Sequence, residues 1–204
     1  MQPRCRRLFG FAAAGLPGFA TAAAWLKKPP MAASPDELFA YLDRLGIAHK
    51  TVRHAPVFRV DESRALRGKI PGAHTKNLFL RDKKGAAFLV VALEDAAIAL
   101  KSLHRRLGAS GRFSFGSAPL LAELLGVEPG SVTPFAAIND AASRVTVVLD
   151  AAMMAHEVLN FHPLRNTATT TIARDGLVKF LEATGHHPRI EPVSGPAAMA
   201  GQGN

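Results

Sequence analysis

Three short stretches of the chain carry polar side chains of types that could take part in chemistry. Lys76 and Asn77 stand at the start of the apolar run "TKNLFL". A lysine can hold a phosphate as a point charge, and an asparagine can both donate and accept hydrogen bonds. Each residue also has a simpler interpretation as an exposed residue at the edge of a sheet.

The other two stretches are "GVEPGSVTPF" and "NFHPLRNTATT". In the first, Gly130 and Pro134 bracket a loop whose backbone groups could face a ligand, because glycine lets the chain approach closely. The alternative is a plain connection between a helix and a strand. In the second, His162 precedes a proline and a series of Asn and Thr residues, which could line a pocket or form the wet face of a strand. A lone histidine beside proline can equally be structural.

Several classes of site lack their sequence signatures. The chain has one cysteine, Cys5, and contains no HExxH, GxSxG, GxGxxG or Walker motif. We therefore expect no bound metal, no cofactor, no serine-hydrolase triad and no nucleoside-triphosphate fold.

The composition is that of a globular protein with an anionic partner. The chain has 204 residues, 48% hydrophobic and 20% charged, with a formal net charge of +9. This length allows one domain with a sizeable core. Residues 1–30 contain five basic residues and no acid, so they carry more than half of the net positive charge. Charge alone is therefore only modest support for RNA binding by the rest of the chain.

We divide the chain into an N-terminal extension (1–30), a single domain (31–190) and a disordered tail (191–204). The extension is basic, rich in alanine and free of acids, which is typical of a targeting peptide, but Met31 also begins a stretch that looks like a natural start. The extension could thus be an over-extended start, a disordered segment or a signal.

Residue patterns in the body predict an α+β (mixed α/β) fold with roughly six strands in a mixed sheet. Ser34 and Ser117 are predicted N-caps, and Gly46 and Gly126 are predicted helix ends. We expect helices at 34–46, 61–68, 95–107, 117–126 and 173–186, and strands at 48–55, 74–93 (a hairpin), 111–117, 133–140, 143–153 and 157–173 (one or two strands).

Taken together and in order, four stretches resemble a known family. They are "HTKNLFLRD", "SFGSAPLLAELLGVEPGSVTPFAAIND", "RVTVVLD" and "NFHPLRNTATTTI". These resemble the free-standing prolyl-tRNA editing proteins of the YbaK/ProXp superfamily, related to the editing domain of bacterial prolyl-tRNA synthetases. The resemblance covers about residues 34–187 and is greatest to the branch that deacylates alanyl-tRNA(Pro).

The resemblance implies the YbaK/aminoacyl-tRNA synthetase-associated fold and a deacylase that cleaves mischarged Ala-tRNA(Pro) in trans, without metal and with help from the substrate's ribose hydroxyl. It implies that Lys76 lies near the terminal adenosine, that Asn77 holds the aminoacyl group and that His162 shapes the amino-acid pocket by catalysis or by bulk. The substrate-binding residues expected beside them are Gly130, Ser131, Val132, Thr133, Pro134, Asn166 and Thr167.

The expected partner is the acceptor end of tRNA(Pro), with prolyl-tRNA synthetase or an elongation factor as further partners, and neither DNA nor membrane. We expect a cytoplasmic location, because a chain with a single cysteine suits a reducing compartment. The basic residues expected to contact the acceptor stem are Lys101, Arg105, Arg106 and Arg112. Two alternatives stay open: a deacylase for Cys-tRNA(Pro) or another small amino acid, and a tRNA- or synthetase-binding module without turnover. A metal-dependent hydrolase is disfavoured by the missing ligands.

Overall fold

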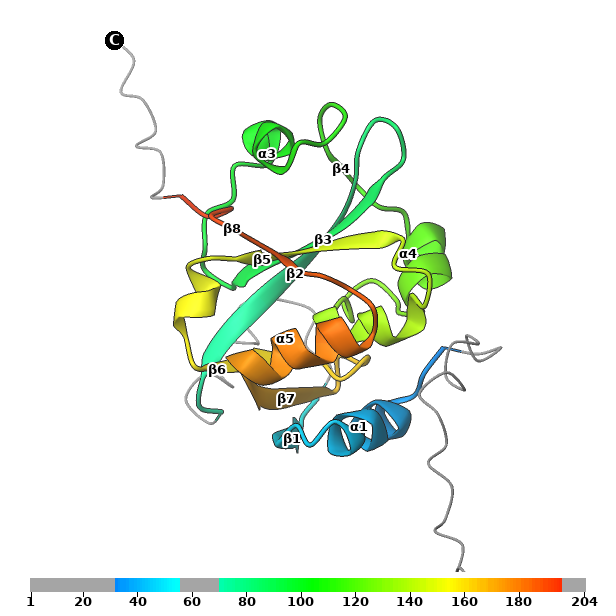
Figure 1. Ribbon diagram of the computed structural model, residues 1–204, viewed down its shortest axis with the longest axis vertical. Coiled ribbons are helices and arrows are strands. Elements are labelled where there is room, and N and C mark those ends of the chain that lie inside the picture. The colour runs from blue at the N-terminus through cyan, green and yellow to red at the C-terminus, as the bar shows by residue number, and fades with distance from the viewer. Residues whose placement is uncertain (1–31, 56–69, 196–204) are drawn as a thin grey trace, which may run out of the picture.

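A computed structural model describes residues 32–55 and 70–195. They form a mixed α/β structure in which helices cover both faces of one mixed sheet (Figure 1), which confirms the predicted fold class. The predicted helix at 61–68 and the extension at 1–30 lie outside the described residues.

The sheet has eight strands in the order β1-β7-β6-β2-β3-β5-β8, with β4 pairing separately with β2. Three pairs are parallel: β2 with β6, β3 with β5, and β5 with β8. The other pairs, including the β2–β3 hairpin, are antiparallel. The strands are β1 (His49–Arg53), β2 (Ala73–Arg81), β3 (Ala87–Leu93), β4 (Ser114–Phe115), β5 (Val145–Asp150), β6 (Val158–Phe161), β7 (Ala168–Ala173) and β8 (Arg189–Glu191).

Two hydrophobic cores lie on opposite faces of this sheet. Because side chains alternate along a strand, Phe79 of β2 faces one core and Leu80 faces the other. The larger core includes buried leucines of α1 (Pro35–Arg44), α4 (Ala118–Leu125) and α5 (Arg174–Ala183), together with the 3₁₀ helix η2 (Pro134–Asn139). The smaller core is covered by Leu103 and Leu107 of α3 (Leu100–Leu107).

The predicted helix caps are present. Ser34 and Glu37 form a reciprocal capping box at the start of α1, and the hydroxyl of Ser117 accepts from the N–H of Leu120 at the start of α4. Gly126 ends α4 with a left-handed φ of 63°. These local signals fix the helices that pack against the larger core.

Three predictions about the elements were wrong. Residues 133–140 were expected as a strand but contain η2, because Pro134 starts the helix and the Thr133 hydroxyl caps it through the N–H of Phe135. The predicted helix at 95–107 begins only at Leu100. The described part of the sheet has eight strands rather than roughly six: β4 lies within the strand predicted at 111–117, but β8 was not predicted, because its three residues are too few to give a periodic signal.

The first residues of the predicted tail belong to the fold. β8 extends to Glu191, and the Ser194 hydroxyl donates to Oδ2 of the buried Asp150 at 2.6 Å. A buried carboxylate requires such donors, and the residues just after β8 provide them.

His186, just after the last helix, is buried against Asp140. Its Nε2 lies 3.3 Å from Oδ2 of Asp140, which also accepts from the N–H of Val145 at 2.7 Å. Burial raises the pKa of the Asp140 carboxyl, but the hydrogen bonds from His186 and the backbone outweigh it, so the pKa lies below its usual value. The pair ties the end of α5 to the turn before β5.

Within residues 32–55 and 70–195, no helix is long and apolar enough to cross a membrane.

Candidate functional site

A gap along one edge of β2 lies at the centre of the candidate site. β3 pairs with residues 75–81 of β2 along the other edge. On the gap side, β6 pairs only with Ala73 and His74, and β4 pairs only with Leu80 and Arg81. The two neighbouring strands therefore leave residues 75–79 of β2 beside an opening, where the chain after β6 turns away.

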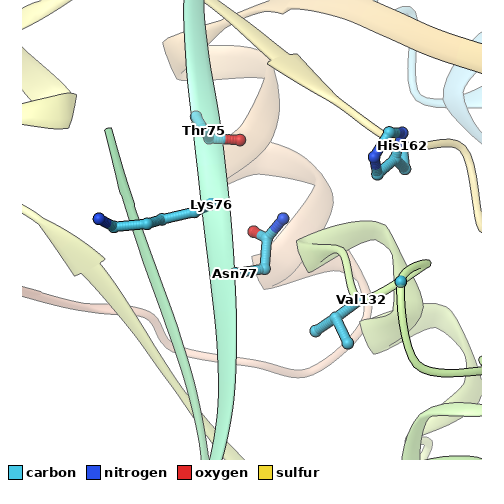
Figure 2. A pocket seen from close by; sticks show the side chains of 6 residues that line it. Thr75, Lys76, Asn77, Val132 and His162 are labelled. Atoms are coloured by element: carbon cyan, nitrogen blue, oxygen red, sulfur yellow. The ribbon is translucent and has the colours of Figure 1, made fainter. Parts of the chain in front are cut away.

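A pocket of about 180 Å³ occupies this opening. Figure 2 shows that the side chains of Asn77, Val132 and His162 converge on it from three separate elements. Its lining residues are Thr75, Lys76, Asn77, Gly130, Val132 and His162. The strand β2, the loop after α4 and the turn after β6 thus meet at one small cavity.

Asn77 presents an unsatisfied hydrogen-bond acceptor here. Its Oδ1 atom is buried and accepts no hydrogen bond from any described residue. A buried acceptor without a partner costs roughly 1–3 kcal/mol. A ligand that donates a hydrogen bond to Asn77 would remove this cost.

His162 is a half-buried imidazole with a defined tautomer. Its Nδ1 lies 3.0 Å from the carbonyl oxygen of Ala168, so Nδ1 carries a proton and donates. Burial lowers the pKa of His162, and the nearby His54 lowers it further, although the hydrogen bond to Ala168 acts in the opposite direction. In the resulting neutral ring, Nε2 is an acceptor and the imidazole is a flat wall of the pocket.

The family model for the aminoacyl-tRNA editing domain matches residues 54–180. This range contains all three elements of the pocket. The chain belongs to the aminoacyl-tRNA editing domain family.

Full-length relatives support the assignment. The chain is 41% identical over 156 residues to "Prolyl-tRNA synthetase associated domain-containing protein 1" of Danio rerio, covering 76% of this chain and 84% of the relative. It is 35% identical over 150 residues to "Prolyl-tRNA editing protein ProX" of Acetoanaerobium sticklandii, covering 73% and 91%.

The editing-domain fold is also found among solved structures. A crystal structure of a proposed trans-editing enzyme for prolyl tRNA synthetase matches with a TM-score of 0.59 and 18% identity, over 77% of this chain and 95% of that one. At this identity the likeness shows the fold alone. It agrees with the fold class read from the sequence.

The side chain of Lys76 points in a different direction from that of its neighbour Asn77. Adjacent residues of β2 point to opposite faces, and the Lys76 side chain points away from Asn77 and His162 (Figure 2). Its ammonium group donates a hydrogen bond to the carbonyl oxygen of Ala96. The contact of Lys76 with the terminal adenosine therefore stays a prediction, and in this structure its ammonium is directed elsewhere.

The loop at 130–134 divides into a part that lines the pocket and a part that supports it. Gly130, with φ of 90°, and Val132 line the cavity. Ser131 is largely buried and its N–H donates to the carbonyl of Glu128, while Thr133 and Pro134 are buried at the start of η2. The last three residues hold the loop in place rather than line the cavity.

Asn166 and Thr167 follow the turn after His162. A Cβ atom at Gly130 would lie 3.8 Å from Nδ2 of Asn166, so Asn166 is next to the pocket loop. Thr167 is exposed, and its carbonyl accepts from the N–H of His54. Their predicted contacts with substrate stay predictions.

The hydroxyls further along β7 join strands together instead of lining the pocket. The Thr170 hydroxyl lies 2.8 Å from that of Thr51 on β1, and the Thr171 hydroxyl donates to Oδ1 of Asn160 on β6 at 2.6 Å. The threonine hydroxyls of β7 therefore link neighbouring strands of the sheet.

The four basic residues predicted to contact the acceptor stem are all exposed, and they are not brought to the pocket. Lys101, Arg105 and Arg106 lie on α3, which covers the smaller core, whereas Asn77 and Phe79 point to the opposite face of β2. Arg112 lies in the loop between α3 and β4.

Two residues near the pocket were not predicted as site residues. Thr75 lines the cavity, and its hydroxyl donates to the carbonyl of Asn160. The ring of His54 lies 6.3 Å from that of His162, and its Nε2 lies 2.9 Å from the hydroxyl of Thr169. Thr75 could have been found because it has the same parity as Asn77 along β2. Nothing in the spacing of His54 and His162 along the chain indicates their proximity.

Among the described residues there is no group of three or more His, Cys, Asp or Glu side chains arranged to hold a metal ion.

Proposed function

We propose that the protein is an aminoacyl-tRNA deacylase that hydrolyses the ester of mischarged Ala-tRNA(Pro) in trans. The observation that carries the proposal is the cavity of about 180 Å³ between Asn77 on β2 and the neutral imidazole of His162, with the buried Oδ1 of Asn77 left without a partner among the described residues. Membership of the aminoacyl-tRNA editing domain family and the name of the Acetoanaerobium relative support the reaction class.

The pocket chemistry fits an aminoacyl ester. The α-ammonium group of an amino acid donates hydrogen bonds and would satisfy Oδ1 of Asn77. The aminoacyl ester is already activated, so the protein mainly needs to position it and to polarise a water molecule. The neighbouring ribose hydroxyl assists that water, and the described residues act by positioning.

The size of the cavity supports a small amino acid. Pockets for drug-sized ligands are typically about 300–1,000 Å³, well above the volume found here. Val132 and the His162 ring bound the space, and one methylene more or less in such a pocket changes binding by roughly 1–3 kcal/mol. Cysteine is close to alanine in size, so a Cys-tRNA(Pro) deacylase is the second candidate.

The test is deacylation of Ala-tRNA(Pro), Cys-tRNA(Pro) and Pro-tRNA(Pro) by the full chain, with His162→Ala in parallel. We expect fast loss of alanine alone, and loss of discrimination in His162→Ala if the ring acts by bulk. A matching rate on Cys-tRNA(Pro) would favour the second candidate. Loss of activity in chelator would favour a metal-dependent hydrolase. If all three esters decay at the rate without protein, the protein is a binding module and the proposal fails.

A further inference from the structure

The turn of the β2–β3 hairpin and the loop before β4 form a strongly basic surface away from the pocket. Arg81, Lys83 and Lys84 of the turn and Arg112 of the loop are all exposed. Residues 96–122, which lead into and out of this loop, contain no aspartate or glutamate. We call Arg81, Lys83, Lys84, Arg112 and Phe115 the hairpin-tip surface.

The acid of the turn is used internally and does not neutralise this surface. Asp82 is 7% exposed, and its Oδ1 accepts from the N–H groups of Lys84 and Ala86 at 2.9 Å. Its Oδ2 accepts from the N–H of Ser110 at 2.9 Å, and the N–H of Lys83 donates to the carbonyl of Ser110. Asp82 thus joins the turn and the loop into one unit.

Two glycines bring the basic side chains against this unit. Gly85 and Gly111 have φ of 92° and 84°, a region that favours glycine. A Cβ at Gly85 would lie 3.1 Å from Nη2 of Arg81, and one at Gly111 would lie 3.2 Å from Cβ of Lys83. The guanidinium group of Arg81 therefore lies along the turn, and the aliphatic stem of Lys83 lies along the loop.

An exposed aromatic ring lies beside these charges. Phe115 is 64% exposed, although its neighbour Phe113 packs on Phe88 at 5.0 Å between ring centroids. Exposed aromatic rings next to basic residues are typical of surfaces that bind single-stranded nucleic acid, because bases stack on the ring while cations hold the phosphates.

The hairpin-tip surface flanks the same edge of β2 that opens onto the pocket. Phe115 pairs with Leu80, three residues along β2 from Asn77, which is roughly 10 Å along the strand. Because Leu80 faces the smaller core, Phe115 lies on the face opposite to Asn77, and a nucleic-acid strand bound there would reach the pocket around this open edge. Figure 1 shows α3, the β2–β3 turn and β4 gathered at one end of the molecule, so the predicted contacts on α3 lie near this surface.

We propose that the hairpin-tip surface binds the sugar–phosphate strand of the RNA whose 3′ end enters the pocket, with a base stacked on Phe115. This inference rests on the proposed function for the identity of that RNA. Of the contacts expected from the sequence it keeps Arg112, but in place of those on α3 it assigns the binding to the turn around Asp82 and to an exposed ring.

The experiment compares the full chain with two variants, the triple substitution Lys83→Ser, Lys84→Ser and Arg112→Ser, and Phe115→Ala. Affinity for uncharged tRNA(Pro) is measured over a range of salt concentrations, and turnover is measured on Ala-tRNA(Pro) and on the alanyl ester of adenosine. We expect the triple variant to lose at least about tenfold in affinity and the slope of log affinity against log salt to fall by about 2. Phe115→Ala should lose roughly tenfold. Turnover of alanyl-adenosine should not change.

Matched controls distinguish the loss of a cation at the hairpin-tip surface from the loss of a cation elsewhere on the protein. Lys50→Ser removes one exposed cation on β1, at the far edge of the sheet, and should leave tRNA affinity unchanged, whereas Lys84→Ser should weaken it. Wild-type affinity and salt slope in the triple variant, or equal losses on both esters, would overturn the inference. If the wild type cleaves neither ester, the proposed function fails, but the binding measurement still decides the role of this surface.

Discussion

At the scale of single residues, neighbours in the sequence have divergent roles. Asn77 and Lys76 are adjacent on β2, yet one faces the pocket and the other donates to the carbonyl of Ala96 on the other side. The pair could be found in the sequence as a motif. Its division between two faces follows from strand geometry and becomes visible only when the strand is in place.

Asn77→Ala should lower kcat/KM for Ala-tRNA(Pro) by about 10- to 100-fold, since it removes a hydrogen bond to a charged group of the substrate. It should leave the melting temperature unchanged or raise it, because Oδ1 has no partner among the described residues. Measurements of turnover and of thermal unfolding on the same preparation check the expected kcat/KM and the expected melting temperature. A large drop in stability with unchanged turnover would make Asn77 structural.

Lys76→Met keeps the aliphatic stem and removes the ammonium group. We expect a stability loss on the order of 1 kcal/mol, because the hydrogen bond to Ala96 is lost. Urea unfolding measures this, with Lys50→Met on the exposed edge strand as the control. An unchanged stability combined with a raised KM for tRNA would place the ammonium on the substrate.

The protonation of His162 should be visible in the pH profile. Burial lowers its pKa below the usual value of about 6.5, so the ring stays neutral as the pH falls through the range in which an exposed histidine is protonated. We expect kcat/KM, corrected for decay without protein, to stay level from pH 7.5 to about pH 6.5 and to fall only in more acidic solution. The contribution of the neutral His162 ring to the free energy of unfolding is fully present above the pKa that this histidine has in the unfolded chain. It is lost as the pH falls through the lower pKa of His162 in the folded protein. A fall centred above pH 6.5 would contradict the lowered pKa.

At the scale of elements, the strand β2 and two loops share the site. The pocket exists because β6 and β4 pair with different ends of β2 and leave its middle open. The position of the β2–β3 hairpin turn depends on one side chain, Asp82, which connects the turn to the loop before β4.

Asp82→Ala should loosen the turn and the loop together. Hydrogen bonds from the N–H of Ser110, and then from those of Ala86 and Lys84, hold the pKa of Asp82 below its usual value despite burial of the carboxyl. The stability from this lowered pKa is fully present above the unfolded value of about 3.9 and is lost as the pH falls through the folded pKa. The difference in melting temperature between wild type and variant should therefore be large at pH 7 and shrink near pH 3. A difference that does not depend on pH would argue against the ionised carboxylate as the cause.

At the scale of the whole molecule, the two hydrophobic cores draw on both ends of the described part of the chain. Leu38 and Leu42 of α1 are fully buried in the larger core, and Val193 closes the smaller one. Both α1 and the residues just after β8 are therefore parts of the folded unit.

A chain that begins at Met31 should keep the melting temperature and the kcat/KM of the full chain on alanyl-adenosine. A chain that begins at Gly46 is the control: it lacks Leu38 and Leu42, and loss of a buried leucine side chain typically costs about 2–5 kcal/mol, so it should unfold readily. Calorimetry of the three proteins is the measurement. A marked loss of stability in the Met31 chain would show that residues 1–30 contribute to the fold.

The sequence by itself determined the local structure and the site motifs. Capping residues such as Ser34 and Ser117, glycine stops and apolar periodicity are local signals, so the helices and the hairpin could be predicted from them. The motifs around Asn77, Val132 and His162 also indicated the residues that meet at the pocket.

Only the tertiary structure decided which of these residues face one another. η2 replaced a predicted strand because a cap and a proline outweighed its apolar run. The strand order put His54 beside His162, the direction of β2 took the Lys76 ammonium away from Asn77, and the pairing of β4 placed Phe115 beside the basic turn. These relations depend on contacts between residues far apart in the chain, to which local propensity does not respond.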